Sequence, residues 1–218
     1  MYISNVEIGL IVFDFDGTLF DTKKDIAASV NAALTKYGFE PVDEETIWRY
    51  TGDGTEVLLT RILKDNKTPI FKEALNYTLA YYSLNFANFT QPIDDVVDFI
   101  DKFKEKKKVI LSNKNVAIIN KILSKFNLSH EFQAVYGKES FPKSKPDPYP
   151  LLEIMKEFKV PKKNTIFIGD SINDIIISKR AGVKSFIISS DATSIEDIKK
   201  LKPFKIFYNY KEIENLIK

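Results

Sequence analysis

The chain has 218 residues, a length that suits one large domain or one domain with a small accessory one. Its 32 basic and 30 acidic residues give a net charge of +2, which provides no general attraction to nucleic acid or to an acidic membrane. The sequence has no cysteine, which excludes disulfides, a thiolate nucleophile and a cysteine-ligated zinc site, and no apolar run reaches the roughly 18 residues that span a bilayer. Since no basic and then apolar signal segment is seen either, we expect a cytoplasmic protein that binds neither nucleic acid nor membranes.

The first predicted element is a buried strand over residues 8–13, and the acidic sequence DFDGTLFD follows it at residues 14–21. Asp14 and Asp16 therefore leave the end of a strand one residue apart, where open α/β sheets bind their ligands. Crowded carboxylates need a cation, and Mg²⁺ prefers such oxygen ligands. Asp14 is a candidate nucleophile that forms an acyl phosphate, and Asp16 is a candidate general acid and base whose carbonyl could also bind the metal.

Residues 22–90 contain helical patterns and no convincing strand. They predict an all-helical insertion that lies over the strand ends and could act as a lid, with hinges near 20–23 and 88–92. Gly52, Asp53 and Gly54 form a flexible loop that could reach the leaving group of a substrate. Arg61 could contact a substrate carboxylate, although an arginine on a surface helix is the more common explanation.

From residue 91 onward, strand-like runs alternate with helical patterns, which predicts a doubly wound parallel sheet of the Rossmann-like type. We expect an α/β core over residues 1–21 and 91–218, with residues 22–90 as a helical cap domain. The predicted strands are 107–111, 133–136, 165–168, 184–188 and 205–207. The predicted helices are 93–105, 115–126, 148–158, 173–181 and 194–201. Lysine-rich stretches, such as 104–108, are expected to be solvated helix ends.

Two further segments could bind phosphate. Ser112 and Asn113 follow a predicted strand, so the hydroxyl and the Asn113 N–H could bind a phosphoryl oxygen at the start of the next helix, or simply cap that helix. Lys145 lies in the sequence KSKPDP at residues 143–148, where two prolines stiffen the backbone. A stiff loop can hold an ammonium group against both a phosphate and a nucleophile.

A second acidic segment follows the strand predicted at 165–168. Asp170 leaves the strand end and could ligate the metal directly. Asp174 lies four residues later and could act through water or hold Lys145. The alternative for Asp174 is an ordinary acidic residue at a helix N-terminus.

These four segments, in this order, resemble the haloacid dehalogenase superfamily over essentially the whole chain. The resemblance is carried by DFDGTLFD at 14–21, SNK at 112–114, KSKPDP at 143–148 and GDSINDI at 169–175. Ser112 stands where threonine is commoner, which keeps the hydroxyl. Within the superfamily, residues 21–26 and 50–59 look most like the phosphoglycolate phosphatase group.

The resemblance implies roles for individual residues. Asp14 would be the nucleophile and Asp16 the acid and base, while Ser112 and Lys145 would bind phosphate. Mg²⁺ would be bound by Asp14, by the carbonyl of Asp16 and by Asp170. Asp174 would belong to the same acidic metal-binding motif.

We therefore expect a Mg²⁺-dependent phosphomonoester hydrolase that acts on a small phosphorylated metabolite through an aspartyl-phosphate, with 2-phosphoglycolate as the first choice of substrate. The protein would be a monomer or a weak homodimer. The alternatives are a phosphosugar mutase of the β-phosphoglucomutase type, an inorganic or nucleotide pyrophosphatase, and a nucleotidase. A non-catalytic relative would be expected to lose a motif acid or Lys145, and this chain keeps them all.

Overall fold

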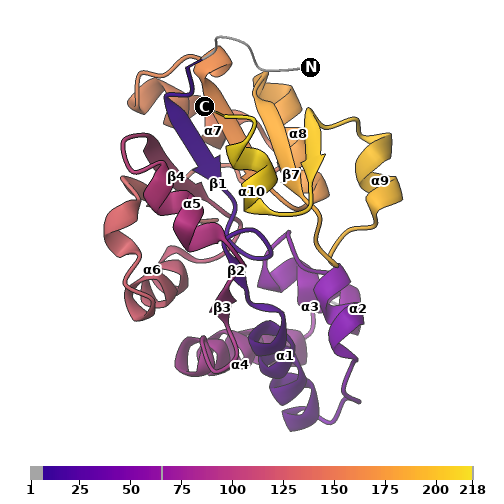
Figure 1. Cartoon of the computed structure of the whole chain (residues 1–218). Helices are drawn as coiled ribbons and strands as arrows, with labels where there is room; N and C mark the ends of the chain where they lie inside the picture. The colour runs from indigo at the N-terminus through magenta and orange to yellow at the C-terminus, as the bar shows by residue number, and fades with distance from the viewer. Residues whose placement is uncertain (1–6, 65, 218) are drawn as a thin grey trace.

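The structure is a computed structural model, and it describes residues 7–64 and 66–217. Residues 1–6 and 218 of the predicted core, and residue 65 of the predicted cap, lie outside the described residues. Figure 1 shows an upper part built of a sheet with helices on both sides, and a lower part that contains the helices α1 to α4. None of the helices in the described part of the chain has the length and apolar character needed to cross a membrane.

The upper part is built on a sheet that has six strands within the described residues, in the order β5-β4-β1-β6-β7-β8. All neighbouring strands in this sheet are parallel. This confirms the predicted doubly wound α/β fold. The strands are β1 (Leu10–Phe13), β4 (Lys107–Leu111), β5 (Ala134–Tyr136), β6 (Thr165–Gly169), β7 (Lys184–Ile188) and β8 (Lys205–Phe207).

Both faces of the sheet are buried, because successive side chains of a strand point to opposite faces. In β1, Ile11 and Phe13 belong to the apolar cluster that includes residues of α5 (Val96–Lys102), α6 (Val116–Lys125) and α10 (Tyr210–Glu214). Leu10 and Val12 belong to a second cluster, with residues of α7 (Tyr149–Glu157) and α8 (Ile172–Ala181). The fully apolar sequence of β1 therefore reflects burial between two helical layers.

The predicted helices are all present; four are shorter than their apolar patterns, while α8 begins one residue earlier than predicted. The pattern at 93–105 yields only α5, because Asp95 adopts a left-handed backbone conformation with φ of 63° and Phe103 ends the helix. The five-residue α10 was not predicted, since so short a helix carries no clear periodicity. The remaining helical elements of this part are α9 (Ile195–Lys200) and the short 3₁₀ turns Ser129–Glu131 and Lys162–Asn164.

The lower part is a helical insertion with its own apolar core. It consists of α1 (Lys23–Lys36), α2 (Glu44–Arg49), α3 (Thr55–Leu63) and α4 (Pro69–Asn85). The buried members of its main apolar cluster are Ala27, Val30, Leu34, Ile47, Leu58, Leu59 and Phe71.

Two short strands, β2 (Phe20–Asp21) and β3 (Gln91–Pro92), pair in antiparallel fashion where the chain enters and leaves the helical insertion. The sequence predicts hinges here, and a two-residue strand is too short to show alternation. Asp25 strengthens this neck, because its carboxylate accepts N–H groups of Phe89 and Thr90 at 3.0 and 2.8 Å and the Thr90 hydroxyl at 2.7 Å.

Lys108 departs from the expected solvated lysine run, since it is only 1% exposed. Its ammonium donates to the carbonyls of Ile100 and Phe103 at the end of α5, and it lies 3.4 Å from a carboxylate oxygen of Glu131. Buried charges need such partners, and here the lysine satisfies backbone carbonyls at a helix C-terminus. The prediction of a solvated side chain is wrong at this position because β4 carries Lys108 into the interior.

Candidate active site

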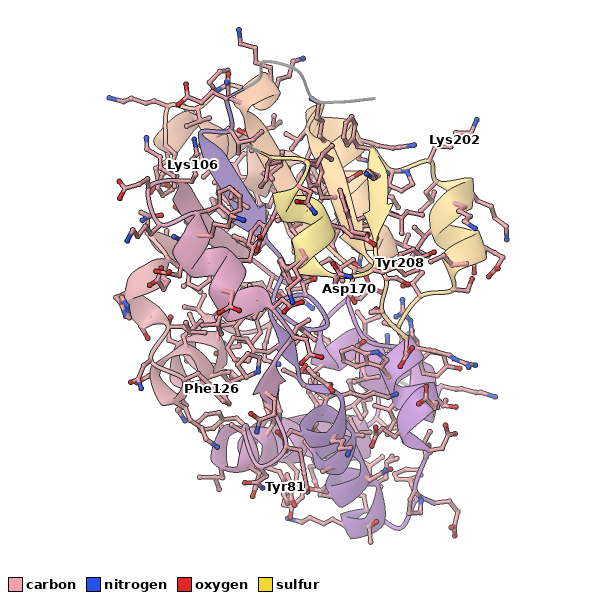
Figure 2. All side chains as sticks on the ribbon, viewed as in Figure 1. Tyr81, Lys106, Phe126, Asp170, Lys202 and Tyr208 are labelled. Carbon is pink, nitrogen blue, oxygen red and sulfur yellow. The ribbon has the colours of Figure 1, made fainter. Side chains whose placement is uncertain are left out.

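Polar side chains follow the ends of three neighbouring strands at one edge of the sheet. Asp14 follows β1, Ser112 follows β4 and Asp170 follows β6, and β1 lies between the other two strands. Parallel strands end at the same edge, so residues far apart in sequence meet there. Figure 2 shows Asp170 at the level where the sheet part meets the helical insertion.

Lys145 lies between two carboxylates. Its Nζ is 2.7 Å from Oδ1 of Asp14 and 2.7 Å from Oδ1 of Asp174, and its side chain is 1% exposed. Burial alone would lower the pKa of Lys145, but the charges of Asp14 and Asp174 more than offset burial and raise it. The ammonium is therefore held in its charged form.

Asp14, Asp170 and Asp174 form a buried acidic cluster in which one carboxylate oxygen from each lies within 4.8 Å of the others. Burial is the largest cause that raises the pKa of Asp14 to about 6, and the charge of Asp174 adds to it. Burial and the charge of Asp14 also raise the pKa of Asp170 well above its usual value. The cluster contains three carboxylates, and Lys145 pairs with two of them, so it fits a divalent cation in charge and in donor type.

Asp170 is oriented by two hydroxyl groups. Thr18 Oγ1 donates to Oδ1 at 2.9 Å, and Ser190 Oγ donates to Oδ2 at 2.8 Å. Gly17 has a φ of +76°, and a Cβ at this position would lie 2.3 Å from Asp170 Oδ2. The turn after Asp16 therefore needs glycine both for its backbone conformation and for its close approach to this carboxylate.

Asp174 is fixed by a capping box at the start of α8. Its Oδ2 accepts the backbone N–H of Ser171 at 3.0 Å and the Ser171 hydroxyl at 2.6 Å. Its Oδ1 is left for Lys145. Both readings made from the sequence thus describe this residue, since it is a helix-start acid and it also holds the lysine.

Asp16 lies beside the cluster, with its side chain 22% exposed. Its Oδ1 accepts the Thr22 hydroxyl at 2.6 Å and the ammonium of Lys114 at 2.7 Å. Lys114 also donates to the hydroxyl of Tyr82 on α4 at 2.7 Å. Neither Lys114 nor Tyr82 was expected at the site from the sequence. Lys114 belongs to the SNK segment, but nothing in the sequence connects Tyr82 with Asp16.

Ser112 and Asn113 are both buried at the end of β4. The hydroxyl of Ser112 accepts the backbone N–H of Lys114 at 3.3 Å. The side-chain amide of Asn113 donates to the carbonyl of Lys145 at 3.0 Å and to that of Gly52 at 2.8 Å. Asn113 thus joins the lysine loop to the helical insertion through its side chain, a contact that the sequence analysis did not predict.

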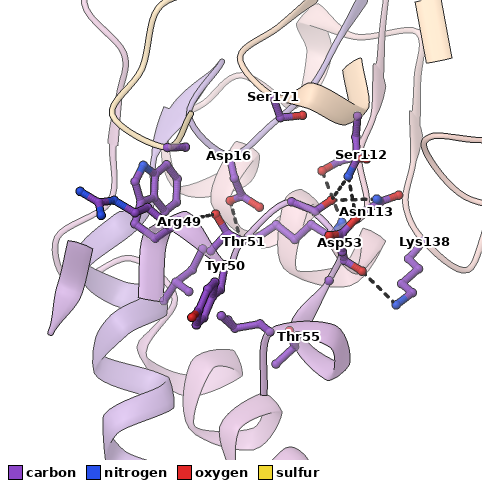
Figure 3. Close-up of a pocket in the computed structure, with 18 of the residues that line it drawn as sticks. Asp16, Arg49, Tyr50, Thr51, Asp53, Thr55, Ser112, Asn113, Lys138 and Ser171 are labelled. Carbon is purple, nitrogen blue, oxygen red and sulfur yellow. Dashed lines mark hydrogen bonds and ion pairs between the residues drawn. The ribbon is translucent and has the colours of Figure 1, made fainter. Parts of the chain in front are cut away.

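The predicted loop at Gly52–Gly54 reaches the sheet part. Asn173 Nδ2 donates to Asp53 Oδ1 at 2.7 Å, and Lys138 Nζ donates to the carbonyl of Asp53 at 3.3 Å. Figure 3 shows Asp53 near Asn113, with a dashed contact to Lys138. Arg61 donates to a carboxylate oxygen of Asp53 and, at 2.9 Å, to the carbonyl of Tyr50, so its guanidinium is engaged within the helical insertion.

A cavity of about 1160 Å³ lies between the sheet part and the helical insertion. Nine of the eleven site residues predicted from the sequence line it, while Lys145 and Asp174 are buried next to Asp14 and do not. The predicted residues that line it are Asp14, Asp16, Gly52, Asp53, Gly54, Arg61, Ser112, Asn113 and Asp170.

Comparisons with known proteins point to one family. The family model for haloacid dehalogenase-like hydrolases matches residues 11–188. A phosphoglycolate phosphatase from Psychrobacter arcticus is 32% identical over 211 residues, which cover 92% of each chain. One from Aquifex aeolicus is 32% identical over 178 residues, 81% of this chain and 82% of the relative. The crystal structure of a predicted phosphoglycolate phosphatase from Haemophilus somnus superposes with a TM-score of 0.89 at 26% identity, covering 97% of this chain and 98% of the other.

Proposed function

The chain belongs to the haloacid dehalogenase-like hydrolases and is a phosphatase, and on this premise we propose that it hydrolyses a small phosphomonoester, with 2-phosphoglycolate as the preferred substrate. The observation that carries the proposal is Asp14, buried 2.7 Å from Lys145 and lining the same cavity as Asp16. The names of the curated relatives support 2-phosphoglycolate.

In the proposed reaction, a carboxylate oxygen of Asp14 attacks the phosphorus atom, and the bond from phosphorus to the ester oxygen breaks. Protonated Asp16 gives its proton to that oxygen, so the alcohol leaves neutral. A water molecule then attacks the phosphorus of the aspartyl-phosphate while Asp16 takes up its proton. Phosphate leaves, and the Asp14 carboxylate is restored.

The electrostatic difficulty is that Asp14 and the phosphate are both negative. Each pair of unit charges ~4 Å apart repels by ~1–4 kcal/mol at effective dielectric constants of ~80 to ~20. The buried ammonium of Lys145 offsets this repulsion beside Asp14. In the proposal, the Ser112 hydroxyl and the Asn113 N–H bind the phosphoryl oxygens.

Mg²⁺ fits the acidic cluster, since burial and then the charges of neighbouring carboxylates raise the pKa values of Asp14 and Asp170, and a divalent cation would offset both effects. Asp14, the carbonyl of Asp16 and Asp170 would hold the ion, with Asp174 behind them. When bound, Mg²⁺ neutralises charge on the phosphoryl group and stabilises the transition state.

We also assign residues 22–90 as a cap domain over a core of residues 1–21 and 91–218. The contacts of Asp53 with Asn173 and Lys138 support a loop that closes on the core. The engagement of Arg61 by Asp53 and Tyr50 supports a role in shaping that loop. In the proposal the enzyme is a monomer or a weak homodimer, and it acts on a small phosphorylated metabolite in the cytoplasm.

The test is a screen of phosphate release by the purified protein with MgCl₂. The panel contains 2-phosphoglycolate, p-nitrophenyl phosphate, sugar phosphates, nucleotides and pyrophosphate. We expect the highest kcat/KM for 2-phosphoglycolate. Conversion of glucose 1-phosphate to glucose 6-phosphate without free phosphate would instead identify a mutase.

A further inference from the structure

Lys114 is a buried cation in the cavity wall that the proposed reaction does not use. Its side chain is 7% exposed, and its Nζ lies 2.7 Å from Asp16 Oδ1 and 2.7 Å from the hydroxyl of Tyr82. Burial alone would lower the pKa of Lys114, but the charge of Asp16 and the hydroxyl of Tyr82 more than offset burial and raise it. The group therefore carries a full positive charge next to the proposed acid and base.

The ammonium of Lys114 can accommodate a further acceptor. An ammonium group has three N–H donors, and Asp16 and Tyr82 take two of them in the described structure. Both partners and Lys114 itself line the cavity, so an acceptor that enters the cavity can reach this group. Thr22 also donates to Asp16 Oδ1, at 2.6 Å, so Asp16 keeps a partner if the ammonium is shared.

Three other cations near the proposed reacting atoms are already engaged, and Arg49, which also lines the cavity, makes no hydrogen bond or ion pair with Asp16 in the described part of the chain. Lys145 is paired with Asp14 and Asp174 and does not line the cavity. The guanidinium of Arg61 contacts Asp53 within the helical insertion, and Lys138 donates to the carbonyl of the same residue. Lys114 is the cation that directly contacts the residue proposed to protonate the ester oxygen.

We propose that Lys114 recognises a carboxylate on the alcohol portion of the substrate, with Tyr82 holding the ammonium in place from the helical insertion. The inference rests on the proposed function, because it takes Asp16 as the group beside the ester oxygen. In 2-phosphoglycolate the carboxylate is separated from the ester oxygen by one carbon atom. An ester oxygen next to Asp16 would therefore bring this carboxylate close to Lys114, which contacts Asp16. Lys114 would thus select phosphate esters of small hydroxy acids over phosphate esters of alcohols that carry no charge.

The test compares two phosphate esters that differ only in whether they carry the carboxylate. Ethyl phosphate has a methyl group in place of the carboxylate of 2-phosphoglycolate. In Lys114→Met, the ratio of kcat/KM for 2-phosphoglycolate to that for ethyl phosphate should fall by about 10- to 100-fold, the usual effect of losing a hydrogen bond between charged groups. Lys114→Arg, which keeps the charge, should retain part of the preference.

Lys121→Met is the matched control. Lys121 lies on α6 and donates to the carbonyl of Ser83 at 3.2 Å, so it also joins the sheet part to α4, but it does not line the cavity. Lys121→Met also removes one positive charge where the sheet part meets the helical insertion. It should leave the ratio of kcat/KM for the two esters unchanged. Tyr82→Phe removes only the hydroxyl that supports Lys114 and should lower the ratio by a smaller factor, which keeps the test available if Lys114→Met fails to fold.

The possible outcomes are distinguishable. An equal fall for both substrates in Lys114→Met would show that the lysine acts only by positioning Asp16, and it would overturn the inference. A wild-type enzyme that hydrolyses both esters equally well would also overturn the inference, while the phosphatase function would stand. A wild-type enzyme that hydrolyses neither ester, but does hydrolyse another member of the panel, would overturn the choice of 2-phosphoglycolate itself.

Discussion

Lys145 and its two carboxylate partners show how strongly single charges are coupled in this site. The ammonium is 1% exposed and lies 2.7 Å from both Asp14 and Asp174. A buried charge is tolerated only when it is paired, so the lysine and the carboxylates depend on one another for stability as well as for chemistry. Asp170 stands apart from this pairing, since within residues 7–64 and 66–217 its carboxylate accepts the hydroxyls of Thr18 and Ser190 and no ammonium.

Replacing Lys145 should therefore destabilise the protein. In metal-free buffer, Lys145→Met should lower the free energy of unfolding by about 3–5 kcal/mol, because it leaves buried carboxylates without a cation. Urea unfolding measures the change. Lys143→Met is the control from the same loop, since Lys143 is exposed and pairs only with Asp147, and it should change stability by less than about 0.5 kcal/mol. Equal effects in the two variants would contradict the role of Lys145 as the charge-balancing group.

Substitutions of Asp14 and Asp16, the two acids of the first motif, should lower kcat by different factors. Asp14→Asn should lower kcat by about 10⁴-fold or more, because an amide cannot form the acyl phosphate. Asp16→Ala should lower kcat by about 10²–10⁴-fold, the usual contribution of a general acid and base. Steady-state phosphate release measures both. Unimpaired turnover by Asp14→Asn would exclude it as the nucleophile.

At the scale of elements, the site depends on where each strand ends. β4, β1 and β6 are neighbours in the sheet, and their ends supply Ser112, Asp14 and Asp170. The loop at Gly52–Gly54 meets these ends from the helical insertion, and Asn113 donates to its first carbonyl. The loop that follows each strand therefore carries the residues of the proposed reaction, while the strand itself supplies apolar packing.

Gly54 is the position in the Gly52–Gly54 loop where a substitution should affect substrate binding. It has a φ of +91°, and a Cβ there would lie 3.0 Å from Lys138 Nζ and 3.3 Å from the carbonyl of Asn113. Gly54→Ala should raise KM for 2-phosphoglycolate several-fold as the loop withdraws, and steady-state kinetics measure the change. Gly38→Ala is the control, since its φ of +77° imposes a similar strain of about 1–2 kcal/mol but nothing lies within 4 Å of the new methyl group. A similar rise of KM in both variants would attribute the effect to general destabilisation.

At the scale of the whole molecule, the proposed reaction site lies between two separately packed parts. The sheet part and the helical insertion have their own apolar clusters, and the cavity lies between them. They are joined by the neck of β2 and β3 and by contacts such as Lys114 with Tyr82. The acidic cluster belongs to the sheet part alone, so its metal affinity can be measured without substrate.

Adding MgCl₂ to metal-free protein should raise Tm. At a concentration 100 times Kd the stabilisation is about 2.7 kcal/mol, which corresponds to about 5–10 °C for a chain of this size. The effect should shrink as pH falls through about 6, because the pKa of Asp14 is raised to about 6 and protons then compete with the metal. Differential scanning calorimetry at several pH values measures this, and Asp170→Asn should abolish the shift. A shift that persists in Asp170→Asn would place the metal elsewhere.

Much of the fold could be predicted because it rests on local patterns. The strands appear as apolar runs, and the alternation of strands with helices identifies the doubly wound sheet. The limits of α5, the pair β2 and β3, and α10 could not be predicted, because each depends on a few residues whose conformation is set by contacts distant in sequence. Lys108 is buried for the same reason, since its partners lie on α5 and at Glu131.

The class of fold, the order of the motifs and the family can be derived from the sequence, because they depend on residue type, spacing and chain order. Most of the side-chain contacts at the site can be recognised only in the folded chain. Lys114 bridges Asp16 and Tyr82 across the junction of the two parts, and Ser190 reaches Asp170 from beyond β7. The physical reason is that hydrogen bonds and ion pairs act over about 3 Å in space, while the residues that make them here are separated by 20 to 98 positions along the chain.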